Sequence, residues 1–89
     1  AGKRNWTRFA DGVLLEFTTD PAQPAEWKSG YMHNVSQGGC GFWSKRELST
    51  RTAVWVREVV DEEHSPWLPA EVAHCTRGLR GFLIGVVFA

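Results

Sequence analysis

The sequence lacks several features that would assign it to a common functional class. Its 10 basic and 10 acidic residues give no formal net charge, which argues against a general binder of long nucleic acids. No apolar run approaches the roughly 18 residues of a membrane helix, and the first residues do not read as a signal peptide. We therefore expect a cytoplasmic domain that makes no membrane contact through this segment.

Cysteines and metal-ligand patterns are also sparse. The two cysteines, Cys40 and Cys75, are expected to be free thiols, because nothing marks the protein as secreted. The three histidines are scattered and no C-x-x-C pair is present, so no metal site is expected. Ser36 and Cys40 lie near His33, but neighbours along a strand rarely form a catalytic triad. We therefore expect no enzymatic activity.

What the chain does contain is a high aromatic content for its size. At 89 residues we expect one domain, and its five tryptophans offer large rings that can supply much of the core. Trp6, Phe42, Trp43 and Trp55 would alternatively form a stacking face for single-stranded nucleic acid. The neutral charge disfavours that alternative, and core packing is expected for most of these rings.

The order of apolar runs and turn signals predicts an all-β fold. Residues 53–60 show no helical stripe and are mainly β-branched or aromatic. Residues 21–25 are a predicted loop, since two prolines three apart suit neither helix nor inner strand. The acidic run that ends at Glu63 is a predicted hairpin connection, and the last strand is apolar enough to be buried on both faces or to close a barrel. Six strands are predicted, at residues 13–19, 27–35, 40–44, 53–60, 67–76 and 82–88. The pattern indicates a small six-stranded antiparallel β-barrel.

The most informative stretch is residues 33–43, HNVSQGGCGFW. It contains the pattern N-x-S-x-x-G at Asn34, Ser36 and Gly39, with a further glycine at Gly38. Glycines beside short polar side chains suit a tight turn, and they also let a flat polar ligand approach the main chain. Because apolar residues lie on both sides of this motif, Tyr31 and Met32 before it and Phe42 and Trp43 after it, we expect the turn to join two strands.

The N-terminal segment of the chain is basic. Lys3, Arg4 and Arg8 lie within the first ten residues, which contain no acid, and the two arginines form the pattern R-x-x-x-R. Residues 1–11 show no clear periodicity, so we expect a flexible basic arm. A local basic arm on a balanced surface suits a small anionic ligand.

The arginine pair, the N-x-S-x-x-G turn and the final G-V-x-F at residues 85–88 together resemble the PilZ domain, a bacterial receptor for cyclic di-GMP. The resemblance spans nearly the whole chain and implies a barrel of residues 12–89 behind the arm. It also implies a sensor that needs no cofactor and that passes ligand occupancy to an attached effector domain or a protein partner. Because the chain ends directly after a predicted strand, we expect it to be one domain of a longer polypeptide.

The resemblance also implies roles for individual residues. Arg4 and Arg8 would read guanine O6 and N7 or hold a phosphate, because the guanidinium fork matches both groups. Lys3 would add a phosphate contact, although many relatives have arginine there. Asn34 would accept from guanine N1–H and N2–H, more weakly than the aspartate common in the family. Ser36 would donate or accept a hydrogen bond.

The two turn glycines, Gly38 and Gly39, complete the expected ligand-binding set. Gly39 would let a base lie against the backbone, or it would serve the turn alone. Two alternatives to nucleotide sensing remain: a PilZ-like protein-interaction module that binds no nucleotide, and a small nucleic-acid-binding barrel. A titration with cyclic di-GMP, GTP and a short oligonucleotide separates the three.

Overall fold

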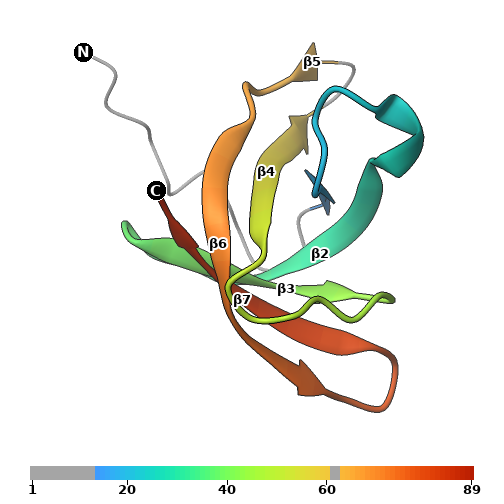
Figure 1. Cartoon of the computed structure of the whole chain (residues 1–89), viewed down its shortest axis with the longest axis vertical. Coiled ribbons are helices and arrows are strands. Elements are labelled where there is room, and N and C mark those ends of the chain that lie inside the picture. Colours follow the sequence, from blue (N-terminus) through green and yellow to red (C-terminus); the bar gives the residue numbers. More distant parts are fainter. Residues whose placement is uncertain (1–13, 61–62) are drawn as a thin grey trace.

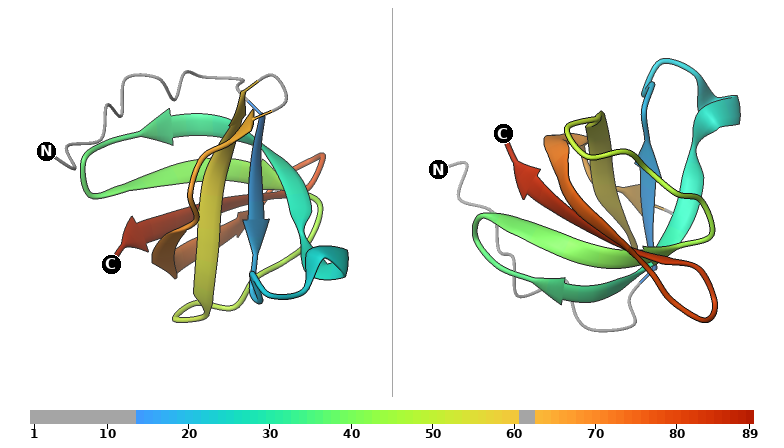
Figure 2. Two further views of the ribbon diagram at one scale, coloured as in Figure 1. Left: turned by 90° about the horizontal axis from the view of Figure 1, so that it is seen from above. Right: turned by 60° about the horizontal axis from the view of Figure 1, so that its bottom comes forward.

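The chain forms a closed antiparallel β-barrel, seen in a computed structural model that describes residues 14–60 and 63–89 (Figures 1 and 2). Its main strands are β1 (Leu14–Thr18), β2 (Lys28–Val35), β3 (Gly39–Ser44), β4 (Ala53–Val60), β6 (Leu68–Arg77) and β7 (Phe82–Phe88). They are hydrogen-bonded in the order β1-β2-β3-β7-β6-β4, and the pairing of β4 with β1 closes the barrel. The six-stranded antiparallel barrel predicted from the sequence is confirmed. The predicted arm, with Lys3, Arg4 and Arg8, lies outside the described residues.

Three local features differ from the prediction. Residues Glu63–His64, expected in a connection, form the short strand β5 beside the end of β4. Residues Pro24–Glu26 form one 3₁₀ turn, η2, within the predicted loop. Proline is tolerated there because it occupies the first helical position, whose N–H needs no intrahelical acceptor. The last strand, β7, lies between β3 and β6, and the barrel closes elsewhere, between β1 and β4.

The core is mostly aliphatic, contrary to the expectation that tryptophans supply much of it. Phe42 is completely buried among aliphatic side chains such as Leu15, Val54 and Ile84. By contrast, 39% of Trp43 is exposed and Trp55 is only half-buried. Successive side chains of a strand point to opposite faces, so the inward position of Phe42 places Trp43 outside. For the same reason, Trp55 points outward between two buried valines.

The outer face of β1 and β4 carries a buried ion pair covered by two tryptophans. Glu16 and Arg57 are directly opposite across these strands, and Arg57 Nε donates to Glu16 Oε1 at 3.0 Å. The guanidinium carbon lies 4.6 Å from the ring centre of Trp27 and 3.9 Å from that of Trp67. The charge-assisted hydrogen bond joins β1 to β4 where the barrel closes. The two cation–π contacts hold Trp27, just before β2, and Trp67, just before β6, against this strand pair.

Across the described ranges, 14–60 and 63–89, no helix is long and apolar enough to cross a membrane.

Candidate functional site

The N-x-S-x-x-G motif forms the tip of the β2–β3 hairpin, as predicted. The Ser36 N–H donates to the Gly39 carbonyl oxygen at 2.8 Å, and the Ser36 hydroxyl donates to the same oxygen at 3.4 Å. Gln37 and Gly38 thus form a two-residue connection. The Phe88 N–H donates to the Gly38 carbonyl oxygen at 2.8 Å, so the end of β7 holds this tip in place.

Two β-bulges lie on either side of the central β3–β7 strand pair. In β2 the register shifts between Met32 and Asn34, and in β6 it shifts between Val72 and His74. Met32 and Val72 are buried in the core. Side chains two positions apart in a regular strand face the same side, so without the extra residue of each bulge Asn34 and His74 would also face inward. The bulges instead turn Asn34 and His74 to the outer face, where both are exposed.

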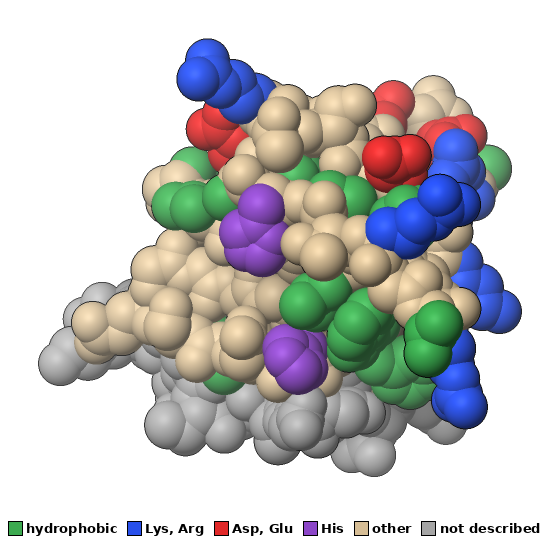
Figure 3. All heavy atoms as spheres, turned by 90° about the horizontal axis from the view of Figure 1, so that it is seen from below, with side chains coloured by type: hydrophobic (Ala, Val, Ile, Leu, Met, Phe, Trp, Pro, Cys, Tyr) green, Lys and Arg blue, Asp and Glu red, His purple; other side chains and the backbone are tan. Residues whose placement is uncertain are grey.

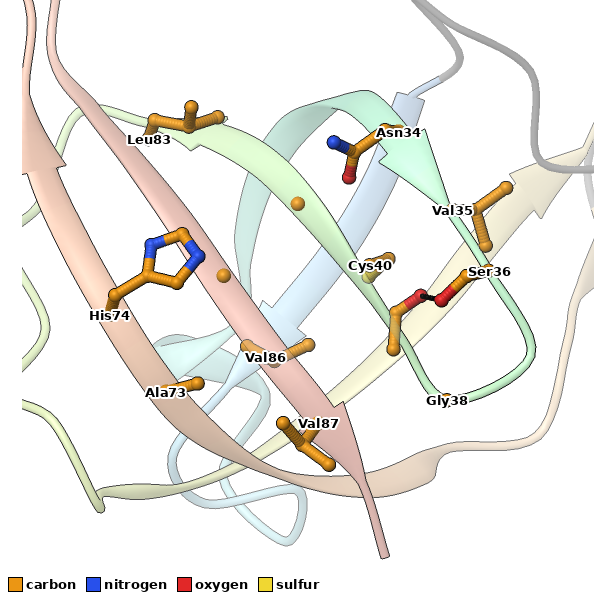
Figure 4. A pocket seen from close by; sticks show the side chains of 13 residues that line it. Asn34, Val35, Ser36, Gly38, Cys40, Ala73, His74, Leu83, Val86 and Val87 are labelled. Carbon is orange, nitrogen blue, oxygen red and sulfur yellow. Dashed lines mark hydrogen bonds between the residues drawn. The ribbon is translucent and has the colours of Figure 1, made fainter.

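These two bulges bring together a row of four residues from adjacent strands. Asn34 is paired with Gly41, Gly41 with Gly85, and Gly85 with His74. The Asn34 Oδ1 atom lies 2.8 Å from the place where a Cβ on Gly41 would be, and the His74 ring occupies the corresponding place at Gly85. Figure 4 shows the amide and the imidazole extending toward each other over this glycine floor.

The row and the hairpin tip line one hollow of about 490 Å³, which we call the Asn34–His74 pocket. At Gly41 and Gly85 the Asn34 amide and the His74 ring lie over the backbone, and the polar side chains of the pocket are Asn34, Ser36 and His74. None of the described residues that line it is a lysine or an arginine. The pocket therefore offers hydrogen-bonding groups and an imidazole face suited to a planar polar ring, while the charge for any bound anion has to come from elsewhere.

Of the predicted ligand residues, Asn34, Ser36, Gly38 and Gly39 all line this pocket. His74 was missed, because a single histidine in an alternating strand has no distinctive sequence pattern. One usable signal was Gly85, since an isolated glycine inside an apolar strand indicates a bulge or a close approach.

The two motif glycines differ sharply in their surroundings. A Cβ on Gly38 would meet no atom within 4 Å, so this glycine faces open space. Gly39 is buried, and a Cβ there would collide with the backbone carbonyl oxygen of Val86 in β7. The prediction that Gly39 lets a base lie against the backbone is not needed to explain a glycine at this position. The close approach of β7 already requires it.

Cys40 also lines the pocket but is poorly suited to covalent chemistry. Only 7% of the residue is exposed, and burial raises the pKa of its thiol to about 12. At neutral pH almost none of it is the reactive thiolate. Cys40 and Cys75 are both free thiols, and the described residues contain no group of three metal-ligating side chains.

Comparison with known proteins assigns the family. A profile described as the PilZ domain matches residues 3–89, which is nearly the whole chain. No curated protein and no solved structure matches the sequence. The profile match covers the hairpin motif, the barrel strands and the N-terminal arginines together, and the chain therefore belongs to the PilZ domain family.

Proposed function

We propose that this chain binds cyclic di-GMP in the Asn34–His74 pocket and acts as a receptor domain without catalysis. PilZ domains are generally cyclic di-GMP receptors and non-catalytic binding domains. The observation that carries the proposal is the convergence of Asn34, Ser36 and His74 on one pocket with a glycine floor. Occupancy is then passed to an attached effector domain or a protein partner.

The pocket chemistry complements one guanine of the ligand. Guanine N1–H and N2–H are donors, and the Asn34 amide oxygen is an exposed acceptor at the edge of the glycine floor. The absence of side chains at Gly41 and Gly85 leaves room for the Asn34 amide and the His74 ring to lie over the backbone there, and the His74 ring offers a base a stacking face or a hydrogen bond. Ser36 retains lone pairs for a further contact beyond its bond to Gly39.

The phosphates of the ligand need cations that the pocket lining lacks. Arg4 and Arg8 are the proposed source, with Lys3 as a third contact, because the motif places them in one short segment. In this proposal residues 1–11 are an arm that closes over ligand bound to the barrel of residues 12–89. Arginine suits the role because its fork grips a phosphate or guanine O6 and N7 with two hydrogen bonds.

We expect Arg4→Ala and Arg8→Ala each to weaken cyclic di-GMP binding by about 1–3 kcal/mol, the size of one lost bidentate contact. The double variant need not show the sum, because both side chains would hold one ligand. Calorimetric titration of the wild-type and three variants measures this, with GTP and a short oligonucleotide as competing ligands. Unchanged affinity in the double variant, or preference for the oligonucleotide, would contradict the proposal.

A second test compares two histidines near Asn34. His74 lies across the pocket from Asn34, and His33 is its neighbour in sequence. His74→Ala should weaken cyclic di-GMP binding by about 1 kcal/mol or more, the lower end of a base-stacking contact. The matched control is His33→Ala. His33 is also exposed, but its ring centre lies 5.9 Å from that of Trp43 and the residue does not line the pocket. Equal effects of the two variants on affinity would remove His74 from the site.

A further inference from the structure

A second hollow, of about 980 Å³, lies at the end of the β2–β3 hairpin opposite its tip. The β2–β3 ladder ends at the pair Tyr31–Trp43, but β2 begins earlier, at Lys28, where it is paired with β1. The two strands therefore part here, and the β6–β7 turn forms the far side of the opening. We call it the Trp43 hollow.

The walls of the Trp43 hollow carry large apolar side chains that are open to solvent. Tyr31 is 58% exposed and Trp43 39% exposed, and Leu79 is fully exposed at the β6–β7 turn. The Trp43 ring is fixed in position, because it packs edge-on against His33 and covers Gly78, where a Cβ would be 2.9 Å from Cζ3. Large apolar side chains gathered around a concave surface mark interaction sites.

The same hollow is lined by cations from three segments of the chain. Lys28 comes from β2, Lys45 and Arg46 follow β3, and Arg80 lies in the β6–β7 turn. No carboxylate is among its described lining residues, although acids and bases are equal in number over the whole chain. Figure 3 shows this arrangement from below, with green hydrophobic side chains bordered by blue Lys and Arg side chains. Positive charge is thus concentrated around the hollow, which favours an anionic partner.

We propose that the Trp43 hollow binds a segment of a partner polypeptide that places one bulky apolar side chain between carboxylates. The concave shape and the rigid Trp43 wall suit an inserted side chain, whereas a bilayer surface would leave the hollow unfilled. Leu79 adds an exposed aliphatic side chain to the aromatic Tyr31 and Trp43, and an apolar side chain of a peptide can pack against all three. The surrounding ammonium and guanidinium groups then bind the flanking carboxylates.

This surface is separate from the Asn34–His74 pocket. The two share no lining residue and lie at opposite ends of the same β2–β3 hairpin. A partner segment and a nucleotide therefore do not compete for the same lining residues. The inference does not rest on nucleotide binding, and its test is made without nucleotide, so the two proposals can fail independently.

The test selects random peptides displayed on phage against the whole chain, with counter-selection on the variant Lys45→Glu/Arg46→Glu. We expect enriched peptides to combine an aromatic or large aliphatic residue with neighbouring Asp or Glu. For such a peptide, fluorescence anisotropy should show about tenfold weaker binding to the charge-reversed variant and about fivefold weaker binding to Leu79→Ser. The matched control Arg51→Glu reverses an exposed arginine outside the hollow and should change affinity less than about twofold.

Several results would overturn the proposal. One such result is that no peptide is selected by the wild-type chain in preference to the charge-reversed variant. Another is that the selected peptides lack carboxylates. Phosphatidylglycerol vesicles and an oligothymidylate are assayed in parallel. If either binds in a manner that requires Lys45 and Arg46, and no peptide does, the proposal is wrong. Melting curves check that the variants fold, and Arg80→Glu replaces any variant that does not.

Discussion

Gly39→Val is expected to destabilise the barrel by about 3 kcal/mol or more, the upper range for forcing atoms into a packed site. The new Cβ would collide with the Val86 carbonyl oxygen, which is backbone and cannot rotate away. To make room, β3 and β7 would have to separate where Gly39 is paired with Val87 and Cys40 with Val86. Urea unfolding followed by tryptophan fluorescence measures the free energy of unfolding.

The matched control is Gly38→Ala, one residue earlier in the same turn. Its Cβ would face open space, so the free energy of unfolding should change by less than about 1 kcal/mol. If Gly38 lies against the ligand, this variant should weaken cyclic di-GMP binding while leaving the barrel intact. A Gly39→Val protein as stable as the wild type would mean that β7 does not approach β3 as closely as the structure shows.

Arg57→Ala is the second substitution with a large expected effect. It removes the guanidinium that lies between Glu16 and the rings of Trp27 and Trp67. In the folded protein the Arg57 side chain is only 9% exposed and that of Glu16 19%. Removing the arginine of a largely buried ion pair costs up to about 3–5 kcal/mol, because the carboxylate stays partly desolvated and both cation–π contacts are lost. We expect a loss of that size in urea unfolding, with cyclic di-GMP affinity nearly unchanged in the protein that remains folded.

Two further variants separate the charge from the packing. Arg57→Met with Glu16→Leu removes both charges and keeps apolar volume under the tryptophans, so it should recover much of the lost stability. Arg51→Ala removes an exposed arginine that lies outside this ion pair and should change stability by less than about 1 kcal/mol. If Arg57→Ala costs no more than Arg51→Ala, the cluster does not hold the barrel closed.

The sequence was sufficient to predict the six main strands and one part of the site. Runs rich in β-branched and aromatic residues, such as residues 53–60, are typical of strands because these side chains fit a pleated, half-buried surface. The turn at Ser36 and Gly38 was equally predictable, because short polar residues and glycines determine a hairpin tip through local conformation. These features depend on neighbours in sequence, and they placed Asn34, Ser36, Gly38 and Gly39 at one hairpin before any strand pairing was known.

Only the tertiary structure decided which residues complete the pocket. His74 joins Asn34 because two bulges, in β2 and β6, occur at the same row of the barrel and turn both side chains outward over Gly41 and Gly85. A bulge depends on how a strand fits the register of its neighbours, which come from distant parts of the chain. The same holds for Gly39, whose need for a glycine comes from the backbone of β7, far along the sequence.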